Sequence, residues 1–403
     1  MSVMFYDLWG LLMDYVVIVS SVRTPLGALN GNFRSVSAVE LGSATIRKAS
    51  EKIQGKVDSV YMGCVLSAGL GQSPARQAAL KAGLHHSVNC VNVNKACGSG
   101  MAAIMMARNA ILAGDAEVVI AGGMESVTNA PYLLDKVRSG YQFGDGELID
   151  HIVRDGLENA YEKCMTGVYA EDSAKAYSIT REEQDEYTIQ SFLRTRKAIE
   201  SGWFKNEIAH VVVRGEKSDT VIDVDEIPFS VDISRISSLK PAFKRDGTIT
   251  AASASPIADG AAAVLMMKES KAVELGLIPL VRIVAQSSVS MSPKLFAITP
   301  TGAIKDVLRK SGWGIAMVDM LQITETFAVV VMSVIKEFSI DPNKVNAFGG
   351  ACALGHPLGA SGARVIATLI NAMKRKNAKK GLATMCIGGG EGVAMTFERN
   401  PIP

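Results

Sequence analysis

Short apolar runs alternate along the chain with segments whose apolar residues recur every three or four positions. The apolar runs, which are typical of buried strands, lie at residues 15–20, 57–65, 88–93 and 117–121. The segments with helical spacing are residues 38–49 and a stretch that begins near Ser99 and ends at Gly114. Strands that alternate with helices predict an α/β fold whose sheet is mostly parallel and covered by helices on both faces.

The character of the chain changes between residues 128 and 254. Charged residues become frequent through a helical stretch at residues 181–197, and the acidic sequence D-V-D-E leads into a loop that contains proline. Connections of this length are uncommon in compact domains unless they serve a function. We therefore expect residues 128–254 to form an inserted lid, or loop domain, that closes over the active surface.

After Asp259 the pattern of the first part of the chain returns. Five small, polar or apolar residues of the first half have counterparts at the same internal spacing, with Ser99, Gly100, Ile104, Asn109 and Ala110 matching Ser361, Gly362, Ile366, Asn371 and Ala372. Each predicted helix leads to an apolar strand that ends in paired glycines, at I-A-G-G and at C-I-G-G-G. The repeat predicts two halves of similar topology.

These patterns give a provisional division of the chain. The predicted parts are an N-terminal extension at residues 1–12, a first half at residues 13–127 and 255–278, a lid at residues 128–254, and a second half at residues 279–403. The extension lacks the basic start of a signal peptide, and no apolar run reaches the roughly 18 to 20 residues of a membrane span. We expect neither export nor membrane insertion.

Composition narrows the possible partners and compartment. The chain has 403 residues, 48% of them hydrophobic and 20% charged, so it can bury a large core in two or three packed units. A net charge of +2, with no basic run longer than K-R-K at residues 374–376, argues against nucleic-acid binding. Six cysteines without C-x-x-C spacing predict reduced thiols in the cytoplasm, and five histidines without paired spacing argue against structural zinc.

Cys97 is the candidate nucleophile. It lies in N-K-A-C-G-S-G, where a predicted strand gives way to a helix, and the neighbouring glycines leave the approach to its sulfur open. Unpaired N–H groups and the dipole at the start of a helix favour a thiolate, so we expect a lowered pKa. The alternative is a buried structural cysteine, since free cysteine is among the most buried residue types.

The second half supplies two further groups. His356 lies in the glycine-rich segment G-G-A-C-A-L-G-H-P-L-G-A-S-G, and Cys386 begins C-I-G-G-G-E-G. Taken alone, each of these could be a packing residue. Together with Cys97 they provide a nucleophile, a hydrogen-bond donor and an acid/base, which is the set that acyl transfer requires.

These segments resemble the thiolase family over nearly the whole chain from about Met13. V-N-K-A-C-G-S-G-M is similar to the family's nucleophile segment, and G-G-M-E-S-V-T-N-A-P-Y to the approach to its tetramer loop. The glycine-rich segment around His356 is similar to its histidine loop, and C-I-G-G-G-E-G to its second-cysteine loop. The resemblance implies a duplicated α-β-α-β-α layered fold with an inserted loop domain.

The resemblance also implies a role for each catalytic residue. Cys97 would carry the acyl group as a thioester, and Cys386 would move the proton at the α-carbon of the second acyl group. His356 would help to activate Cys97 and would donate to an oxyanion together with a bound water. The N–H groups of Cys97 and Gly388 would form a second oxyanion hole.

Two departures from the family's pattern affect this expectation. The family's N-E-A-F-A, whose asparagine holds the catalytic water, reads T-E-T-F-A here, which puts Thr324 in the asparagine position. In the lid, D-E-I-P-F places Phe229 where an arginine often serves the coenzyme A nucleotide, so Arg235 or Lys240 would have to replace it. The resemblance assigns further coenzyme A or acyl contacts to Ser255, Met165, Phe327 and Ala251.

By resemblance we expect the reversible condensation of two acetyl-CoA to acetoacetyl-CoA and coenzyme A, with acyl-CoA as substrate and no tightly bound cofactor or metal. The alternatives are a thiolase for longer 3-ketoacyl-CoA, a catalytically weakened coenzyme A binder, and a ketoacyl synthase, against which Cys386 argues. The resemblance also implies a homo-oligomer, and the region after G-G-M-E-S favours a tetramer.

Overall fold

The computed structural model describes residues 14–53 and 56–399, so the predicted extension at residues 1–12 lies outside the described residues. The main sheet is built from ten strands in the described part of the chain. Their bounds are β1 Val16–Arg23, β2 Gly27–Ala28, β3 Ser59–Gly63, β4 Asn89–Val93, β5 Val119–Glu125, β10 Ala258–Lys268, β11 Val281–Ser290, β12 Met320–Ile323, β13 Lys380–Ile387 and β14 Glu391–Glu398.

The strand order is β12-β13-β14-β11-β1-β10-β5-β3-β4, with β2 paired to β10. β3 runs parallel to β4 and β5, and β12 runs parallel to β13. The other pairings along this order are antiparallel, so the expectation of a mostly parallel sheet is wrong. β10 explains the error, because it is buried almost throughout and gives the same continuous apolar run that a buried parallel strand would give.

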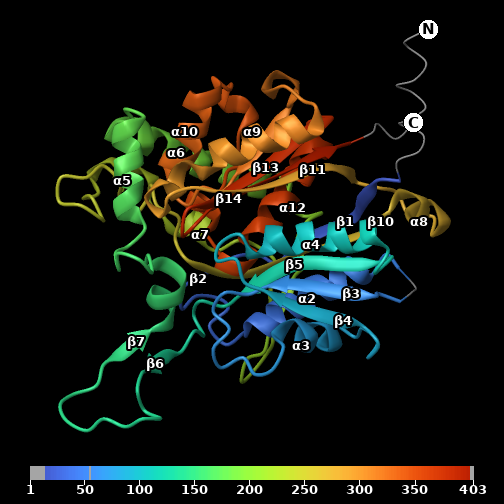
Figure 1. Cartoon of the computed structure of the whole chain (residues 1–403), viewed down its shortest axis with the longest axis horizontal. Coiled ribbons are helices and arrows are strands. Elements are labelled where there is room, and N and C mark those ends of the chain that lie inside the picture. The colour runs from blue at the N-terminus through green and yellow to red at the C-terminus, as the bar shows by residue number, and fades with distance from the viewer. Residues whose placement is uncertain (1–13, 54–55, 400–403) are drawn as a thin grey trace.

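The helices of the two halves are α2 Ala38–Ser50, α3 Pro74–Lys81, α4 Ser99–Ala113, α8 Glu269–Glu274, α9 Thr299–Ser311, α10 Ala328–Phe338, α11 Ala351–Leu354 and α12 Ser361–Arg375. Short 3-10 turns are η3 Pro293–Ile298, η4 Ile315–Met317, η5 Pro342–Lys344 and η6 Leu358–Ala360. In Figure 1, α9 and α10 cover one side, α2 and α3 the other, and α4 and α12 lie between the strands of the two halves. This is the layered α/β architecture that the resemblance implied.

The predicted repeat is present in the strand pairing. A parallel pair, β3-β5, is followed in the sheet by antiparallel β10 and β1, and a parallel pair, β12-β13, is followed by antiparallel β14 and β11. α4 precedes β5 and α12 precedes β13, and both helices have 15 residues and begin with Ser-Gly. The two halves meet where β1 pairs with β11.

Glycine at the second position of α4 and of α12 lets the two helices approach closely. A Cβ atom on Gly362 would lie 2.3 Å from the Met101 nitrogen, and one on Gly100 would lie 2.9 Å from the Gly359 oxygen. A larger residue at either position would force the two backbones apart. The close approach places the loop before α4, which carries Cys97, beside the loop before α12, which carries His356.

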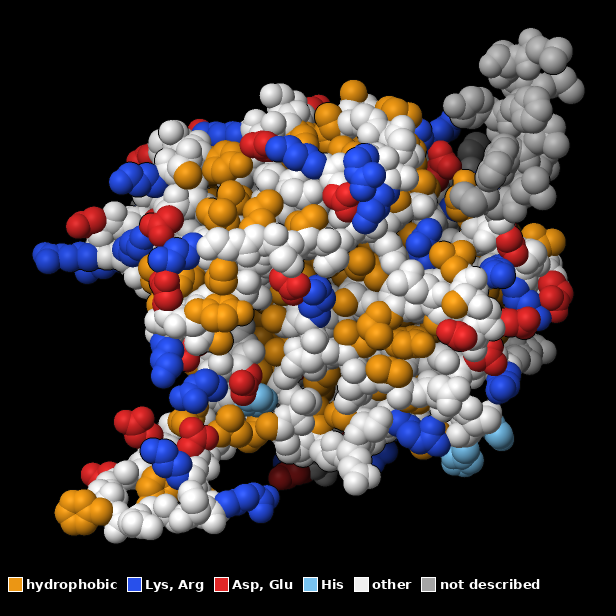
Figure 2. Space-filling model, in the orientation of Figure 1, with side chains coloured by type: hydrophobic (Ala, Val, Ile, Leu, Met, Phe, Trp, Pro, Cys, Tyr) orange, Lys and Arg blue, Asp and Glu red, His pale blue; other side chains and the backbone are white. Residues whose placement is uncertain are grey.

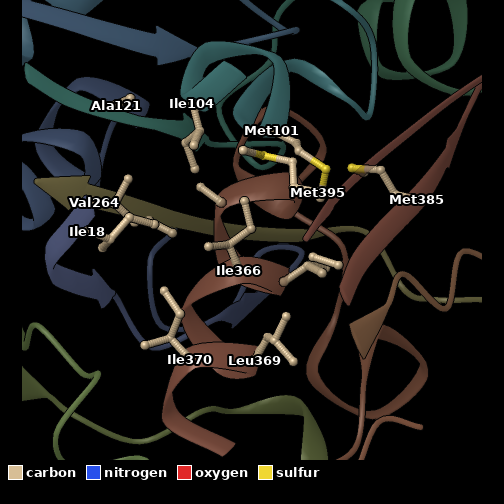
Figure 3. Packing of buried hydrophobic residues seen from close by; sticks show 14 of the residues in the cluster. Ile18, Met101, Ile104, Ala121, Val264, Ile366, Leu369, Ile370, Met385 and Met395 are labelled. Carbon is tan, nitrogen blue, oxygen red and sulfur yellow. The ribbon is translucent and has the colours of Figure 1, made fainter. Parts of the chain in front are cut away.

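The core between the halves is built on these two helices. In Figure 3, Met101 and Ile104 of α4 lie near Ile366 of α12 and the strand residues Met385 and Met395. Residues Ala96–Ala113 are long and apolar enough to cross a membrane by length and composition, but half of that window is buried inside the fold. Its apolar character is therefore that of a helix packed in the core.

The segment at residues 128–254 holds its own short elements. They are β6 Tyr132–Leu134, β7 Leu148–Asp150, the π-helix η1 Ile152–Leu157, α5 Gly167–Ala176, α6 Arg181–Glu200, β8 Val211–Val213, β9 Thr220–Ile222, α7 Ile227–Ser230 and the 3-10 helix η2 Ile233–Ser238. The chain around β6 and β7 projects from the body at the lower left of Figure 1. Arg23 on β1 anchors this segment, since its buried guanidinium pairs with Glu207 at 2.5 Å and Asp225 at 2.7 Å.

Candidate active site

Cys97 lies in a tight turn between β4 and α4. Ala96, directly before it, has φ +43°, a left-handed conformation that is rare for a residue with a Cβ atom. Two hydrogen bonds hold the turn, since the Ala96 N–H donates to Asn94 Oδ1 at 3.0 Å and Ser99 Oγ donates to the Ala96 carbonyl at 2.6 Å. Backbone conformations of this kind persist where the surroundings enforce them, often at functional sites.

The Cys97 thiol is neutral in this structure. Burial raises its pKa to about 11, with a further rise from Glu125, while the N–H groups of Gly388 and of Cys97 itself hydrogen-bond the sulfur and lower it. The expected lowering by the helix start is therefore wrong, because only 8% of the residue is exposed and loss of water outweighs the local N–H groups.

The imidazole of His356 is neutral and is oriented by a hydrogen bond at its Nδ1 atom. Its Nδ1 lies 2.6 Å from Ser361 Oγ, which also lies 2.9 Å from the Pro357 carbonyl. That carbonyl can only accept, so the serine hydroxyl donates to it and accepts from Nδ1–H, which leaves Nε2 with its lone pair. Within residues 14–53 and 56–399, Nε2 has no hydrogen-bond partner, and burial, together with the charge of Arg364, lowers the His356 pKa to about 3.

Cys386 lies near the end of β13, just before the glycines of the second-cysteine loop. Its thiol donates to Thr326 Oγ1 at 3.4 Å. Burial raises the Cys386 pKa to about 12; the Thr326 hydrogen bond lowers it, and the nearby sulfur of Cys97 raises it. Both thiols are therefore protonated in the resting protein.

One cavity of about 120 Å³ brings these groups together. It is lined by catalytic candidates from both halves, by residues of the lid and by aromatic rings, namely Cys97, Gly156, Leu157, Met165, Thr166, Phe243, Ala254, Ser255, Ile257, Phe296, Thr326, Phe327, His356, Leu358, Cys386 and Gly388. A nucleophile, a base, a second acid/base and backbone N–H donors can thus reach one small substrate group, which is what acyl transfer through a thioester needs.

Two of the predicted site residues, Thr324 and Ala251, do not line this cavity, and neither does Phe229. Thr324 is fully buried, and its hydroxyl has no hydrogen-bond partner among the described residues. Ala251 is exposed, and Phe229 is 49% exposed with the guanidinium of Arg196 over its ring. Roles for these residues toward a water or coenzyme A stay predictions.

The structure adds residues that the sequence pattern did not indicate. Phe243 and Phe296 each meet the ring of Phe327 edge to face, at centroid distances of 5.5 and 6.2 Å, and all three rings line the cavity. They come from three distant segments, so no local pattern could have grouped them. Thr326 could have been found, since it is two residues from Thr324 in T-E-T-F-A.

The buried carboxylate of Glu125 fixes the loops around the site. Glu125, at the end of β5, accepts hydrogen bonds from the N–H groups of Val65, Leu66 and Gly359 at 2.7 to 3.1 Å. The bond to Gly359 ties the first half to the loop that follows His356. Burial raises the Glu125 pKa, and the three N–H donors oppose this rise.

Comparison with known proteins agrees with this geometry. Residues 16–270 match the family described as "Thiolase, N-terminal domain", and residues 277–399 match "Thiolase, C-terminal domain". The chain is 48% identical to an acetyl-CoA acetyltransferase of Escherichia coli, over 96% of this chain and 100% of that protein. It is 45% identical to the acetyl-CoA acetyltransferase of Cupriavidus necator, over 96% of this chain and 100% of that protein.

A solved structure shows the same fold. The crystal structure of the Bacillus anthracis acetyl-CoA acetyltransferase superposes with a TM-score of 0.94 at 39% identity, covering 96% of this chain and 99% of that chain. Both family domains, in order, span nearly all of the described residues. This chain belongs to the thiolase family.

Proposed function

We propose that this protein is an acetyl-CoA C-acetyltransferase, which condenses two acetyl-CoA to acetoacetyl-CoA and coenzyme A and catalyses the reverse thiolysis. The observation that carries the proposal is the cavity shared by Cys97, His356 and Cys386, which is small and lined in part by aromatic rings. Relatives of this chain that are named acetyl-CoA acetyltransferase support the same activity.

In the first half-reaction, Cys97 attacks the carbonyl carbon of acetyl-CoA. Its thiol proton passes to the lone pair of His356 Nε2 as the sulfur–carbon bond forms, and the proton then goes to the departing coenzyme A sulfur. Because the resting thiol and imidazole are both neutral, proton transfer and attack occur together. The product is an acetyl thioester on Cys97.

In the second half-reaction, Cys386 removes a proton from the methyl carbon of another acetyl-CoA. The resulting carbanion attacks the thioester carbon, the bond to Cys97 breaks, and acetoacetyl-CoA leaves. The thiol of Cys386, whose resting pKa is about 12, first passes its own proton to the lone pair of His356 Nε2, and His356 returns that proton to the Cys97 sulfur when the thioester bond breaks. Two half-reactions that share one covalent intermediate predict ping-pong kinetics.

Two sets of donors are proposed for the negative charge on oxygen. The N–H groups of Cys97 and Gly388 already point at the nucleophilic sulfur and would serve the thioester oxygen. His356, once protonated at Nε2, would serve the second substrate's oxygen with a water held by Thr324. The partnerless hydroxyl of Thr324 supports the water, because a buried hydroxyl without a partner is costly.

Ser255, Met165 and Phe327 line the cavity, and we propose that they contact the substrate's acyl group and pantetheine arm. Ala251 is exposed and would meet coenzyme A at its outer part. No resident cofactor is proposed. Among residues 14–53 and 56–399, no group of three or more His, Cys, Asp or Glu side chains is arranged to hold a metal ion.

We further propose a homotetramer in the cytoplasm, with residues 128–254 as the lid and the halves bounded as the sequence indicates. β4 is at an end of the sheet, so its outer edge is open to a second copy. Figure 2 shows hydrophobic side chains gathered over the central elements and at the end of the projecting segment at the lower left. Phe143, between β6 and β7, is fully exposed, which supports association of copies at this segment. The six cysteines are free, which supports a reducing compartment such as the cytoplasm.

Thiolysis assays with chains of different length test the activity. We expect turnover of acetoacetyl-CoA with coenzyme A, and little turnover of substrates with 8 to 16 acyl carbons. Cys97→Ala is the control and should abolish turnover. Preference for the longer substrates would assign the protein to the other candidate, a 3-ketoacyl-CoA thiolase, and no turnover of any would favour the weakened coenzyme A binder suggested by Thr324 and Phe229.

A further inference from the structure

A second, larger cavity lies away from the catalytic residues. Its volume is about 640 Å³, which is within the usual range of roughly 300 to 1,000 Å³ for small-molecule sites. It is lined by residues of α6, the start of β12, the turn at η5 and the loop between α12 and β13, namely Arg194, Asp319, Met320, Asn343, Lys344, Ala347, Lys376, Asn377, Ala378 and Lys379. None of them lines the active-site cavity. We call this the basic cavity.

The charged side chains that line the basic cavity are mostly positive. It has four cationic side chains, Arg194, Lys344, Lys376 and Lys379, and one carboxylate, Asp319. The Asp319 carboxylate accepts from the backbone N–H groups of Lys379 and Lys380 at 2.8 and 2.9 Å. In the described part of the chain, none of the four cations forms an ion pair with a carboxylate.

Neutral groups hold three of these cations without cancelling their charge. Arg194 Nη1 donates to the Val345 carbonyl at 2.9 Å, and Lys344 Nζ donates to the Val318 carbonyl at 3.2 Å. The Lys376 ammonium lies over the ring of Trp203, 5.8 Å from its centroid. Side chains that are positioned before a ligand arrives lose less conformational entropy when it binds.

We propose that the basic cavity binds a small anion that carries two or more phosphate groups. Four cations facing one carboxylate leave a local excess of positive charge, and lysine and arginine form their strongest hydrogen bonds with phosphate oxygens. The site also gives a role to Lys376, the last residue of the K-R-K run, which does not line the active-site cavity. A small ligand is favoured over a nucleic acid, because the whole chain has a net charge of only +2.

Binding of two probes to the full-length protein, by calorimetry at low salt, tests the proposal. Inorganic tripolyphosphate measures the contribution of the phosphates alone, and ATP measures a triphosphate carried on a nucleoside. The test variant is the double substitution Lys376→Gln and Lys379→Gln, at two exposed positions of the cavity lining. The matched control is Lys217→Gln with Lys136→Gln, which removes the same charge from exposed positions elsewhere.

We expect saturable binding of at least one probe to the wild type. The test variant should bind that probe at least about tenfold more weakly, because it loses hydrogen bonds to a charged group, and the control variant should bind it as the wild type does. Equal binding of both probes would identify the phosphates as the recognised group, and tighter ATP binding would add the nucleoside. Absence of saturable binding of either probe, or equal weakening in both variants, would overturn the proposal. Binding is measured without turnover, so the result is independent of the proposed catalytic activity.

Discussion

Lys95 Nζ lies 2.6 Å from Glu391 Oε2, and this ion pair joins the nucleophile loop of the first half to the strand that follows the second-cysteine loop. Cys97 is two residues beyond Lys95, and Gly388 is three residues before Glu391. The pair thus spans the two segments whose atoms meet at the Cys97 sulfur. Its partly exposed position makes it a weak contributor to stability and a direct contributor to geometry.

Lys95→Met should lower the kcat of thiolysis several-fold while changing the melting temperature little. The reason is that exposed ion pairs contribute about 0.2 to 1 kcal/mol to stability, whereas a small displacement of reacting groups is costly for rate. Glu391→Gln should have a similar effect, and the double variant should be no worse than either single one. Additive losses in the double variant would mean that the pair does not act as a unit.

Ser361→Ala should reduce kcat about tenfold, because it removes the hydrogen bond that orients His356 and selects its tautomer. KM should change less than kcat. Ser311→Ala is a matched control, since that hydroxyl bonds only to carbonyls within α9. If both variants lose the same activity, Ser361 has no special role toward His356.

Thr324→Asn should raise turnover, because asparagine reaches farther than threonine and offers both a donor and an acceptor to a bound water. Thr324→Val keeps the shape and removes the hydroxyl, so it should lower turnover. Steady-state kcat for acetoacetyl-CoA thiolysis measures both. An unchanged or lower kcat in Thr324→Asn would count against a water held by this position.

Phe296→Leu should enlarge the cavity and admit longer acyl groups. We expect the kcat/KM ratio of six-carbon to four-carbon 3-ketoacyl-CoA to rise about tenfold, since each buried methylene is worth about 0.8 kcal/mol. Phe338→Leu, at a phenylalanine outside the cavity lining, serves as the control. A constant ratio in Phe296→Leu would show that this ring does not limit chain length.

His356 should make stability depend on pH on the acid side. Its pKa is about 3 in the folded state and about 6.5 in the unfolded chain, so only the unfolded state binds the proton as the pH falls between these values. The free energy of unfolding should therefore decrease from about pH 6.5 downward. Urea unfolding of the wild type and of His356→Asn at several pH values isolates this contribution, and parallel curves would refute it.

The sequence predicted those features that local patterns encode. Helix α4, expected from Ser99 to Gly114, begins at Ser99 and ends at Ala113 with Gly114 as its cap, because apolar spacing and a terminal glycine are local signals. The equivalence of Gly100 and Gly362 was visible as a repeat. The direction of β10 was not visible, since a fully buried strand has the same composition in either orientation.

The short motifs of the candidate site can be read from the sequence, although their catalytic roles stay predictions, whereas the other residues that line its cavity cannot. Cys97, His356 and Cys386 each lie in a distinctive short segment, whereas Phe243 and Phe296 are single aromatic residues that only the tertiary fold brings beside Phe327. The expected lowering of the Cys97 pKa is wrong because burial, which raises that pKa, is a property of the whole fold. A helix start can be read from the sequence, but the amount of water excluded around it cannot.

The most direct test of the account is the mass of the active-site peptide after the protein is mixed with acetyl-CoA alone. In Cys386→Ala, which stops the second half-reaction, an acetyl group should accumulate on Cys97, with one equivalent of free coenzyme A released per chain. Cys97→Ala should release none. Acetylation at any other residue, or no covalent adduct in Cys386→Ala, would contradict the proposed acyl-cysteine mechanism.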